Sequence, residues 1–101
     1  VLENKRSTAL MYKRFFQDTS IAFITEPPHA RSNYWLNAIV FENREEREAF
    51  LAYSRGKGVQ TRPVWTLMTH LPMYRWCRCG PLKNAEWLAE RLVNIPSSVR
   101  L

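Results

Sequence analysis

Sulfur and imidazole groups that lie close together in the sequence are the first candidates for chemistry. Cys77 and Cys79 are separated by one residue, and His70 precedes them by seven positions. Such groups bind zinc, but a structural zinc site takes four ligands, usually from two pairs of cysteines spaced two residues apart. The other histidine, His29, is far upstream. We therefore interpret both cysteines as ordinary thiols, with zinc binding as the alternative.

Cys77 and His70 are also candidates for a nucleophilic pair. Cationic neighbours activate thiols in general, and Arg75 and Arg78 flank Cys77. However, this part of the sequence contains no acid to orient a histidine, and no cysteine-protease signature surrounds the thiol. Two cysteines also cannot build the disulfide framework of a small secreted domain, so we expect a reducing, cytoplasmic location.

Positive charge is concentrated in the same part of the chain. The net charge is +6, and no Asp or Glu occurs between Ala49 and Ala85. That stretch contains the cations Arg55, Lys57, Arg62, Arg75, Arg78 and Lys83, together with the aromatic residues Trp65, Tyr74 and Trp76. Arginine binds phosphate through paired hydrogen bonds, and aromatic rings stack on bases. The composition therefore indicates nucleic acid or a phosphorylated small molecule as ligand, or else a basic face that is solvated or meets an acidic partner domain.

The size and composition of the chain indicate one small domain. It has 101 residues, of which 46% are hydrophobic and 24% are charged, values typical of a folded globular protein. No apolar run approaches the length of a membrane span, and residues 1–6 do not resemble a signal peptide. Because the sequence begins at Val1 without Met and ends at Leu101 without a tail, we expect a piece of a longer protein rather than a self-sufficient enzyme.

Hydrophobic periodicity and turn residues predict both helices and strands. Helices are expected at residues 3–17, from the N-cap Asn43 to a stop at Gly56 and Gly58, and from the N-cap Asn84 to Val93. Strands are expected at residues 21–24, 34–41 and 59–62, the last ended by Pro63, and residues 64–83 form a long irregular segment. The strand–helix–strand order in the middle predicts parallel strands if they are neighbours. The expected fold is α+β, with a small three-stranded mixed sheet and helices mainly on one face.

Four motifs of this sequence resemble one protein family. They are Ser32–Ile39 (SNYWLNAI), Gly58–Trp65 (GVQTRPVW), Leu71–Tyr74 (LPMY) and Ala85–Ser98 (AEWLAERLVNIPSS). In this order and spacing they resemble the C-terminal end of the DegT/StrS-type nucleotide-sugar aminotransferases, most closely the members that make bacterial nonulosonic acids or related amino sugars. Residues 1–18 also resemble the long interdomain helix of that family, so the likeness covers nearly the whole chain.

The resemblance implies that residues 1–101 are the C-terminal small domain of a pyridoxal-phosphate enzyme with the aspartate-aminotransferase architecture (fold type I). The large domain, with the cofactor lysine, would lie upstream, and Lys5, Lys13, Lys57 and Lys83 match no cofactor-lysine motif. The parent enzyme would transfer an amino group from glutamate to a keto sugar on a nucleotide, as a homodimer whose active site this domain helps to close. The domain alone would bind no cofactor and be inactive. The alternative function is a stand-alone basic and aromatic module that binds nucleic acid or another anionic partner.

The resemblance also implies substrate-binding residues. Arg62 is carried over as a donor to an anion or hydroxyl group of the substrate, and Trp65 and Tyr74 as walls of the sugar site. Many relatives have a histidine at the position of Thr69, and His70 stands one residue later, so His70 is a secondary candidate. Catalytic, cofactor-binding and metal-binding residues are not expected in this chain.

Overall fold

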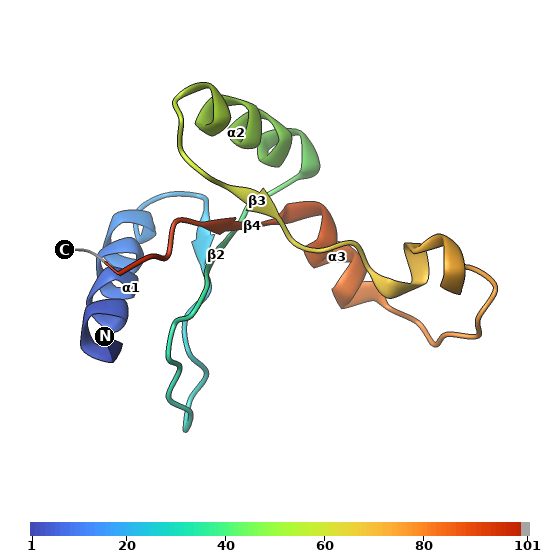
Figure 1. Cartoon of the computed structure of the whole chain (residues 1–101), viewed down its shortest axis with the longest axis horizontal. Coiled ribbons are helices and arrows are strands. Elements are labelled where there is room, and N and C mark those ends of the chain that lie inside the picture. The colour runs from blue at the N-terminus through green and yellow to red at the C-terminus, as the bar shows by residue number, and fades with distance from the viewer. Residues whose placement is uncertain (100–101) are drawn as a thin grey trace.

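An antiparallel sheet of four short strands lies at the centre of the molecule (Figure 1). The computed structural model describes residues 1–99. The strands are β1 (Ala22–Phe23), β2 (Asn37–Val40), β3 (Arg62–Pro63) and β4 (Leu92–Ile95), in the spatial order β1-β2-β4-β3. The helices are α1 (Leu2–Phe16), α2 (Arg44–Gly56) and α3 (Lys83–Arg91), and two 3₁₀ turns, η1 (Met68–His70) and η2 (Pro72–Tyr74), lie between β3 and α3.

The α+β fold class is confirmed, but the expected sheet differs in two respects. The sheet has four strands rather than three, and its neighbouring strands are all antiparallel rather than mixed. β2 and β3 run in the same direction, as the strand–helix–strand order predicts, yet they are not neighbours because β4 lies between them. β2 and β3 are therefore each hydrogen-bonded to β4, which runs antiparallel to both.

The additional strand, β4, consists of residues that were predicted to end the last helix or to follow it. α3 ends at Arg91, before the expected end at Val93, and Leu92 is already extended, with φ −86° and ψ 136°. Val93 and Ile95 are then buried in the core. Residues 91–93 include no glycine or proline, so the sequence has no helix-breaking residue at the point where α3 ends.

α2 has the caps that its sequence predicts, whereas α3 does not. The side chain of Asn43 accepts a hydrogen bond (2.8 Å) from a backbone N–H of the first turn. At the other end, Gly58 adopts φ +75°, and the N–H of the following residue donates to the Ser54 carbonyl (2.9 Å), which completes a Schellman motif. By contrast, α3 begins after Leu82 without a side-chain cap, so the prediction of Asn84 as its N-cap is wrong.

β2 is shorter than the predicted strand because the chain turns at Tyr34. This residue has φ 48°, in the left-handed region that residues other than glycine rarely occupy. Ser32 Oγ accepts from the Tyr34 N–H (2.9 Å), and Asn33 Oδ1 accepts from the next N–H (3.0 Å). The Tyr34 hydroxyl in turn accepts from the Glu26 N–H (3.0 Å). These polar contacts hold the turn and leave Trp35 outside the sheet, where it is exposed.

β3 is an edge strand, and this position explains how it accommodates a proline. The sequence predicts that Pro63 ends a strand at residues 59–62, but the strand consists of Arg62 and Pro63. The next N–H, that of Val64, points to β4 and donates to the Leu92 carbonyl (3.3 Å). Because successive residues of a strand bond to opposite sides, the nitrogen of Pro63 lies on the open side, where the sheet needs no donor.

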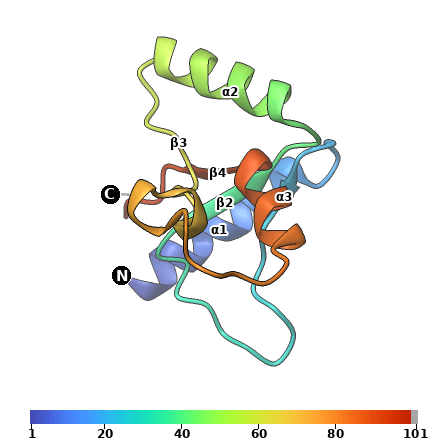
Figure 2. The same cartoon turned by 90° about the vertical axis from the view of Figure 1, so that its right-hand side faces the viewer.

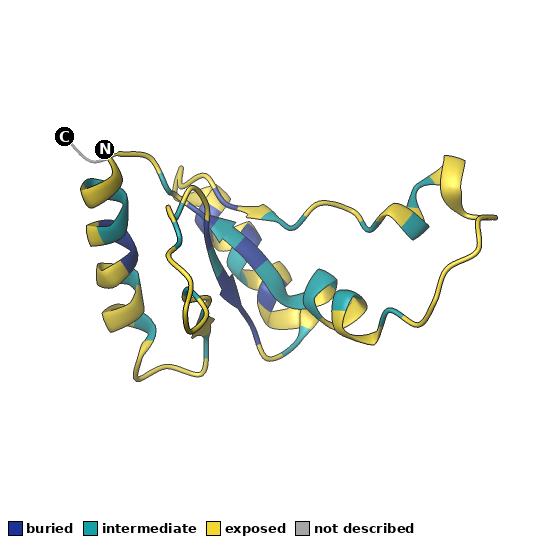
Figure 3. Ribbon diagram, turned by 90° about the horizontal axis from the view of Figure 1, so that it is seen from below, coloured by how far each residue is buried: buried dark blue, intermediate teal, exposed yellow. Residues whose placement is uncertain are grey.

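The core lies on one face of the sheet. Ile39 of β2 and Val93 of β4 are fully buried partners at its centre. Tyr12 of α1 and Phe50 of α2 pack against this cluster, so both helices cover the same face. Figure 3 shows that burial is confined to the sheet and the helix faces near it, and Figures 1 and 2 show α2 and the loop 24–36 at opposite ends of the sheet. None of the helices within residues 1–99 is long and apolar enough to cross a membrane.

Candidate functional site

Residues 64–82, between β3 and α3, extend away from the rest of the molecule, and we call this segment the arm (Figure 1). Apart from η1 and η2, it is irregular, as predicted. Figure 3 shows exposed and intermediate residues along the arm and no buried ones, and its Trp65 and Trp76 are 85% and 83% exposed. Because burial of apolar surface is a main source of folding free energy, the arm contributes little to the stability of the fold.

Arg62 and Trp65 line the same groove. The groove has a volume of about 960 Å³ and runs along residues 58–66, with Arg55 of α2 and Leu71 of the arm completing its lining. Its charged lining residues are the two arginines, and none of its lining residues within the described part of the chain is acidic. Two guanidinium groups beside an indole ring can bind an anion and pack against a ring.

Buried contacts of the preceding residue fix the backbone of Arg62. Thr61 is 4% exposed, and its hydroxyl is hydrogen-bonded to that of Ser54, which is buried in α2. Ser54 also donates to the Leu51 carbonyl (3.2 Å). On the other side, Arg62 is paired with Asn94 of β4. The exposed side chain of Arg62 therefore projects from a backbone that is held by both α2 and the sheet.

A second groove, of about 530 Å³, lies between the start of the arm, α2 and α3. Trp65 and His70 line it, so Trp65 belongs to both grooves. Arg62 does not line this second groove, and His70 does not line the first. The charged lining residues here have both signs and are Arg44, Arg47, Glu86 and Glu90. The second groove is therefore less suited to an anion than the first.

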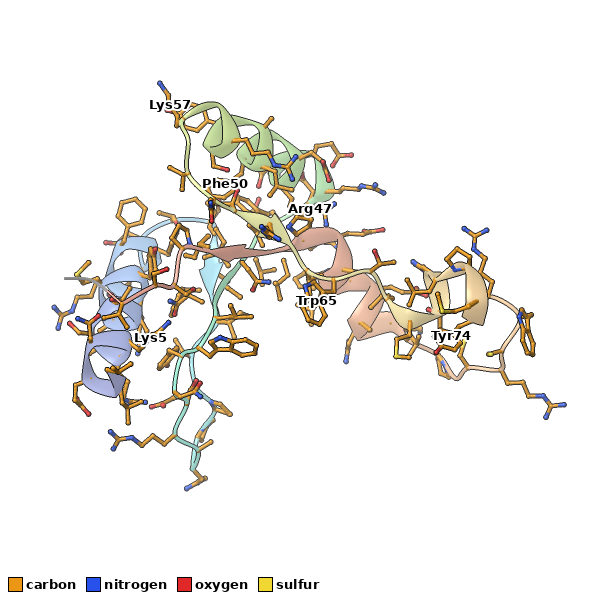
Figure 4. The ribbon with its side chains drawn as sticks, viewed as in Figure 1. Lys5, Arg47, Phe50, Lys57, Trp65 and Tyr74 are labelled. Atoms are coloured by element: carbon orange, nitrogen blue, oxygen red, sulfur yellow. The ribbon has the colours of Figure 1, made fainter. Side chains whose placement is uncertain are left out.

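Tyr74 is not brought close to Arg62. It lies in η2 and lines neither of the two grooves. Figure 4 shows Trp65 beside α3 and Tyr74 further along the arm. A turn holds the Tyr74 backbone, because its N–H donates to the Leu71 carbonyl (2.9 Å) and its own carbonyl accepts from the Cys77 N–H (3.0 Å). Of the three residues predicted for the sugar site, Arg62 and Trp65 thus lie together and Tyr74 lies apart.

Arg47, which sequence reasoning does not single out, joins α2 to α3 (Figure 4). It is 7% exposed, and it donates hydrogen bonds to the Ala89 carbonyl and to the Glu48 carboxylate. Ala89 lies in the last turn of α3, where carbonyls have no partner within the helix. Arg47 therefore caps that end of α3. The available sequence signal is an arginine on the apolar stripe of α2, in line with Phe50 and Ser54.

A second polar cluster joins α1 to the loop before β2. Arg6 of α1 donates to both carboxylate oxygens of Glu26 (2.9 and 3.1 Å) and to the Ser32 carbonyl (2.7 Å). The bonds from Arg6 and from the Ser32 N–H lower the pKa of Glu26 to about 2. The same contact with Glu26 raises the pKa of Arg6. The Arg6 guanidinium also lies 5.6 Å from the centroid of the Tyr34 ring, so the cluster supports the turn that shortens β2.

Cys77 and Cys79 are exposed and form no disulfide. Within residues 1–99, no three side chains of His, Cys, Asp or Glu lie together in a way that could hold a metal ion. His70 lines the second groove, whereas Cys77 lines neither groove. The described part of the chain therefore contains no assembled zinc site.

Comparisons with known proteins identify the family. A family model described as the DegT/DnrJ/EryC1/StrS aminotransferase family matches residues 1–101. Similar solved structures include the sugar aminotransferase CalS13 from Micromonospora echinospora, with a TM-score of 0.85 and 19% identity, over 100% of this chain and 27% of that chain. The aminotransferase TlmJ from Streptoalloteichus hindustanus has a TM-score of 0.82 and 20% identity, over 94% of this chain and 26% of that one. No curated protein sequence matches the chain.

Another similar structure is Helicobacter pylori PseC, an aminotransferase involved in the biosynthesis of pseudoaminic acid. It has a TM-score of 0.82 and 18% identity, over 94% of this chain and 27% of that chain. This chain thus spans about a quarter of the length of the structures it resembles. At these identities the structural likeness shows the fold, and the match of the family model along the whole sequence shows the family. The chain belongs to the DegT/DnrJ/EryC1/StrS aminotransferase family.

Proposed function

We propose that this chain is the C-terminal small domain of a sugar aminotransferase, which transfers an amino group from glutamate to a keto sugar carried on a nucleotide. In this proposal, residues 1–18 connect to a large domain upstream, and the enzyme acts as a homodimer. The domain helps to close the sugar site, with Arg62 binding an anionic or hydroxyl group and Trp65 forming a wall. Tyr74 and His70 approach the same substrate from the arm.

The observation that carries this proposal is the placement of Arg62 and Trp65 in one groove. The groove has two arginines and no acidic residue among its described lining residues, so its charge suits a diphosphate. The backbone of Arg62 is fixed by buried neighbours, whereas Trp65 stands at the start of the exposed arm. In this arrangement, the positioned guanidinium group of Arg62 can bind an anionic group of the substrate. The exposed ring of Trp65 can pack against the substrate as it enters between this domain and another part of the enzyme.

In this proposal, the pyridoxal phosphate is bound outside the two grooves described above. A lysine must reach the cofactor, but neither groove has a lysine among its described lining residues. The Lys5 ammonium donates to the Ser97 carbonyl, and that of Lys57 lies 5.7 Å from the Tyr53 ring centroid. We therefore assign cofactor binding to the large domain and derive no chemical step from this chain. Its proposed contribution is to bind and orient the sugar.

The proposal is tested by Arg62→Ala in the full-length protein that contains this chain. Loss of a charge-assisted hydrogen bond costs about 1.5–3 kcal/mol, so we expect kcat/KM for the nucleotide sugar to fall by roughly 10-fold to 150-fold. The half-reaction with glutamate should keep its rate, because the amino donor does not need the nucleotide site. Steady-state kinetics with each substrate varied in turn measure both effects.

Lys57→Ala is the matched control, because Lys57 is a cation of the same acid-free segment and lines neither groove. Its kinetics should equal those of the unmodified enzyme. An Arg62→Ala enzyme with unchanged kcat/KM for the sugar would contradict the proposed role of the groove. An upstream region without a cofactor lysine would contradict the proposed activity itself.

A stand-alone anion-binding module is the second candidate, favoured by the exposure of Trp65 and Trp76 on an acid-free segment. It predicts that labelled single-stranded oligonucleotides bind the chain and that affinity falls steeply with salt. The aminotransferase proposal predicts negligible binding at physiological salt. A titration at two salt concentrations separates the two functions.

A further inference from the structure

The far part of the arm contains two thiol groups that the proposed function does not use. Cys77 and Cys79 are both free and exposed, and they are separated only by Arg78. Cys77 follows η2 in a defined turn, since its N–H donates to the Tyr74 carbonyl (3.0 Å). Cys77 is thus held on an ordered turn, Cys79 follows two residues later, and both thiols are open to small molecules in solution.

The charged residues nearest to these thiols in the sequence are all of one sign. Arg75 and Arg78 are exposed and stand within two residues of Cys77, and the nearest acidic residues in the sequence are Glu48 and Glu86. Among the described residues, the ion pairs involve other arginines, so both guanidinium groups remain available to a ligand. A small anion that approaches either sulfur therefore meets two unpaired cations and no carboxylate from its own segment.

We propose that Cys77 and Cys79 form a site of thiol–disulfide exchange that selects small disulfides carrying negative charge. In the step, a cysteine thiolate attacks one sulfur of the incoming disulfide, and a new S–S bond to the protein forms as the original S–S bond breaks. The leaving thiolate departs with the electron pair of that bond and takes a proton from water. The disulfide itself is the oxidant, so the step needs no further reactant.

The selectivity comes from the arginines. An anionic disulfide is concentrated near Arg75 and Arg78, and the negative charge that spreads over three sulfurs in the transition state is stabilised by the same cations. For two unit charges about 6 Å from a doubly charged reagent in water, the attraction amounts to a rate advantage of roughly tenfold or more at low salt. Salt at about 0.5 M should remove most of it. This proposal does not depend on the sugar aminotransferase activity.

The test compares two aromatic disulfides on the full chain with both thiols reduced. One is the dianionic dithiobis(nitrobenzoate) and the other is the neutral dithiodipyridine, and both release a coloured thiol that gives the rate. The ratio of the two rates cancels the intrinsic reactivity of the cysteines and reports charge selection alone. We expect a high ratio at about 10 mM salt that falls steadily as salt is raised.

A pair of double variants locates the selecting charges. Arg75→Gln with Arg78→Gln should lower the low-salt ratio by about tenfold, because it removes both cations beside the thiols. Arg14→Gln with Arg44→Gln is the matched control, since it removes the same net charge from α1 and α2, which lie away from the tip of the arm (Figure 1). Its ratio should stay within about twofold of that of the unmodified chain. Far-UV circular dichroism confirms that each variant is folded.

Three results would overturn the proposal. One is a rate ratio that does not change with salt. Another is a ratio that is unchanged in the Arg75→Gln, Arg78→Gln chain while that chain remains folded. The third is an equal fall in both double variants, which would assign the effect to net charge rather than to the cations beside the thiols.

Discussion

The body of the chain, residues 1–63 and 83–99, contains a core of buried side chains, whereas none of the residues of the arm is buried. Ile39 and Val93 of the body have no exposed surface, whereas Trp65 and Trp76 of the arm are more than four-fifths exposed. The body has a packed apolar cluster around the sheet, while the arm is held by local backbone turns. The comparison teaches that the candidate groove lies where the two regions meet, with Arg62 held by the body and Trp65 at the start of the arm. The contacts that hold the fold lie in the body, whereas the arm leaves its aromatic side chains exposed.

Limited proteolysis should give the largest difference between the two regions. Trypsin is expected to cut after Arg75 and Arg78 of the arm at a rate set by the protease, but after Arg47 of the body only when the body unfolds. For a stability of about 5 kcal/mol, the two rates differ by roughly 5 × 10³-fold. A time course followed by mass spectrometry measures this ratio. Early cleavage at Arg47 would show that the body is not the stable unit.

Truncation of core and arm side chains should differ by several kcal/mol. Ile39→Ala removes a fully buried side chain at the centre of the sheet, and we expect the free energy of unfolding to fall by about 2–5 kcal/mol. Met68→Ala is the control on the arm, where the side chain is exposed, and its effect should stay within about 0.5 kcal/mol. Urea denaturation measures both. Equal losses would mean that the arm is packed as firmly as the core.

Arg47 sharpens the comparison within the body, because it connects α2 to the helix that follows the arm. Arg47→Met keeps most of the apolar stem but removes the donor to the Ala89 carbonyl, so we expect a loss of about 1–3 kcal/mol. Arg44→Met, one turn earlier and exposed, should change stability by less than about 0.5 kcal/mol. The measurement is again urea denaturation. An equal, small effect of both substitutions would show that α3 does not depend on this cap.

The smallest expected effect is the pH-dependent contribution of Glu26. Its pKa is lowered to about 2 from a usual value of 4.5, so the folded state favours the ionised carboxylate. The stabilisation is complete above about pH 4.5 and is lost as the pH falls towards 2. The difference in unfolding free energy between the unmodified chain and Glu26→Gln should therefore shrink over that range. A difference that persists at pH 2 would show that it does not come from the charge of Glu26. In a chain that already carries Arg6→Gln, the further substitution Glu26→Gln should have a smaller effect at neutral pH, because the partner of the ion pair is absent.

Features of the fold that depend on local chemistry could be predicted from the sequence. Asn43 and Gly58 mark the ends of α2 because capping needs a side-chain oxygen at one end and a left-handed backbone at the other. β4 could not be found in this way, since Arg91 and Leu92 carry no stop signal and the switch to a strand depends on pairing with β2. The turn at Tyr34 likewise depends in part on a contact that is not local, because the Tyr34 hydroxyl accepts from the N–H of Glu26, eight positions away.

The candidate site shows the same division. Arg62 and Trp65 are three residues apart in the sequence, and both line the groove that runs along residues 58–66. The separation of Tyr74 follows from the path of the arm, which no periodicity in the sequence describes. Arg47 was missed because its role depends on a carbonyl of another helix. The residues proposed to bind the substrate could thus be named from the sequence, whereas a residue that positions an element through a distant contact could not.

Pro63 has a consequence for how this chain behaves at high concentration. The open side of β3 has no N–H at this residue, so a strand from another molecule cannot continue the sheet across it. An edge strand without a proline presents unpaired N–H and C=O groups to which a strand of another molecule can bond. Pro63 of β3 thus disfavours aggregation through this edge, and this effect does not depend on whether the neighbouring Arg62 binds a sugar.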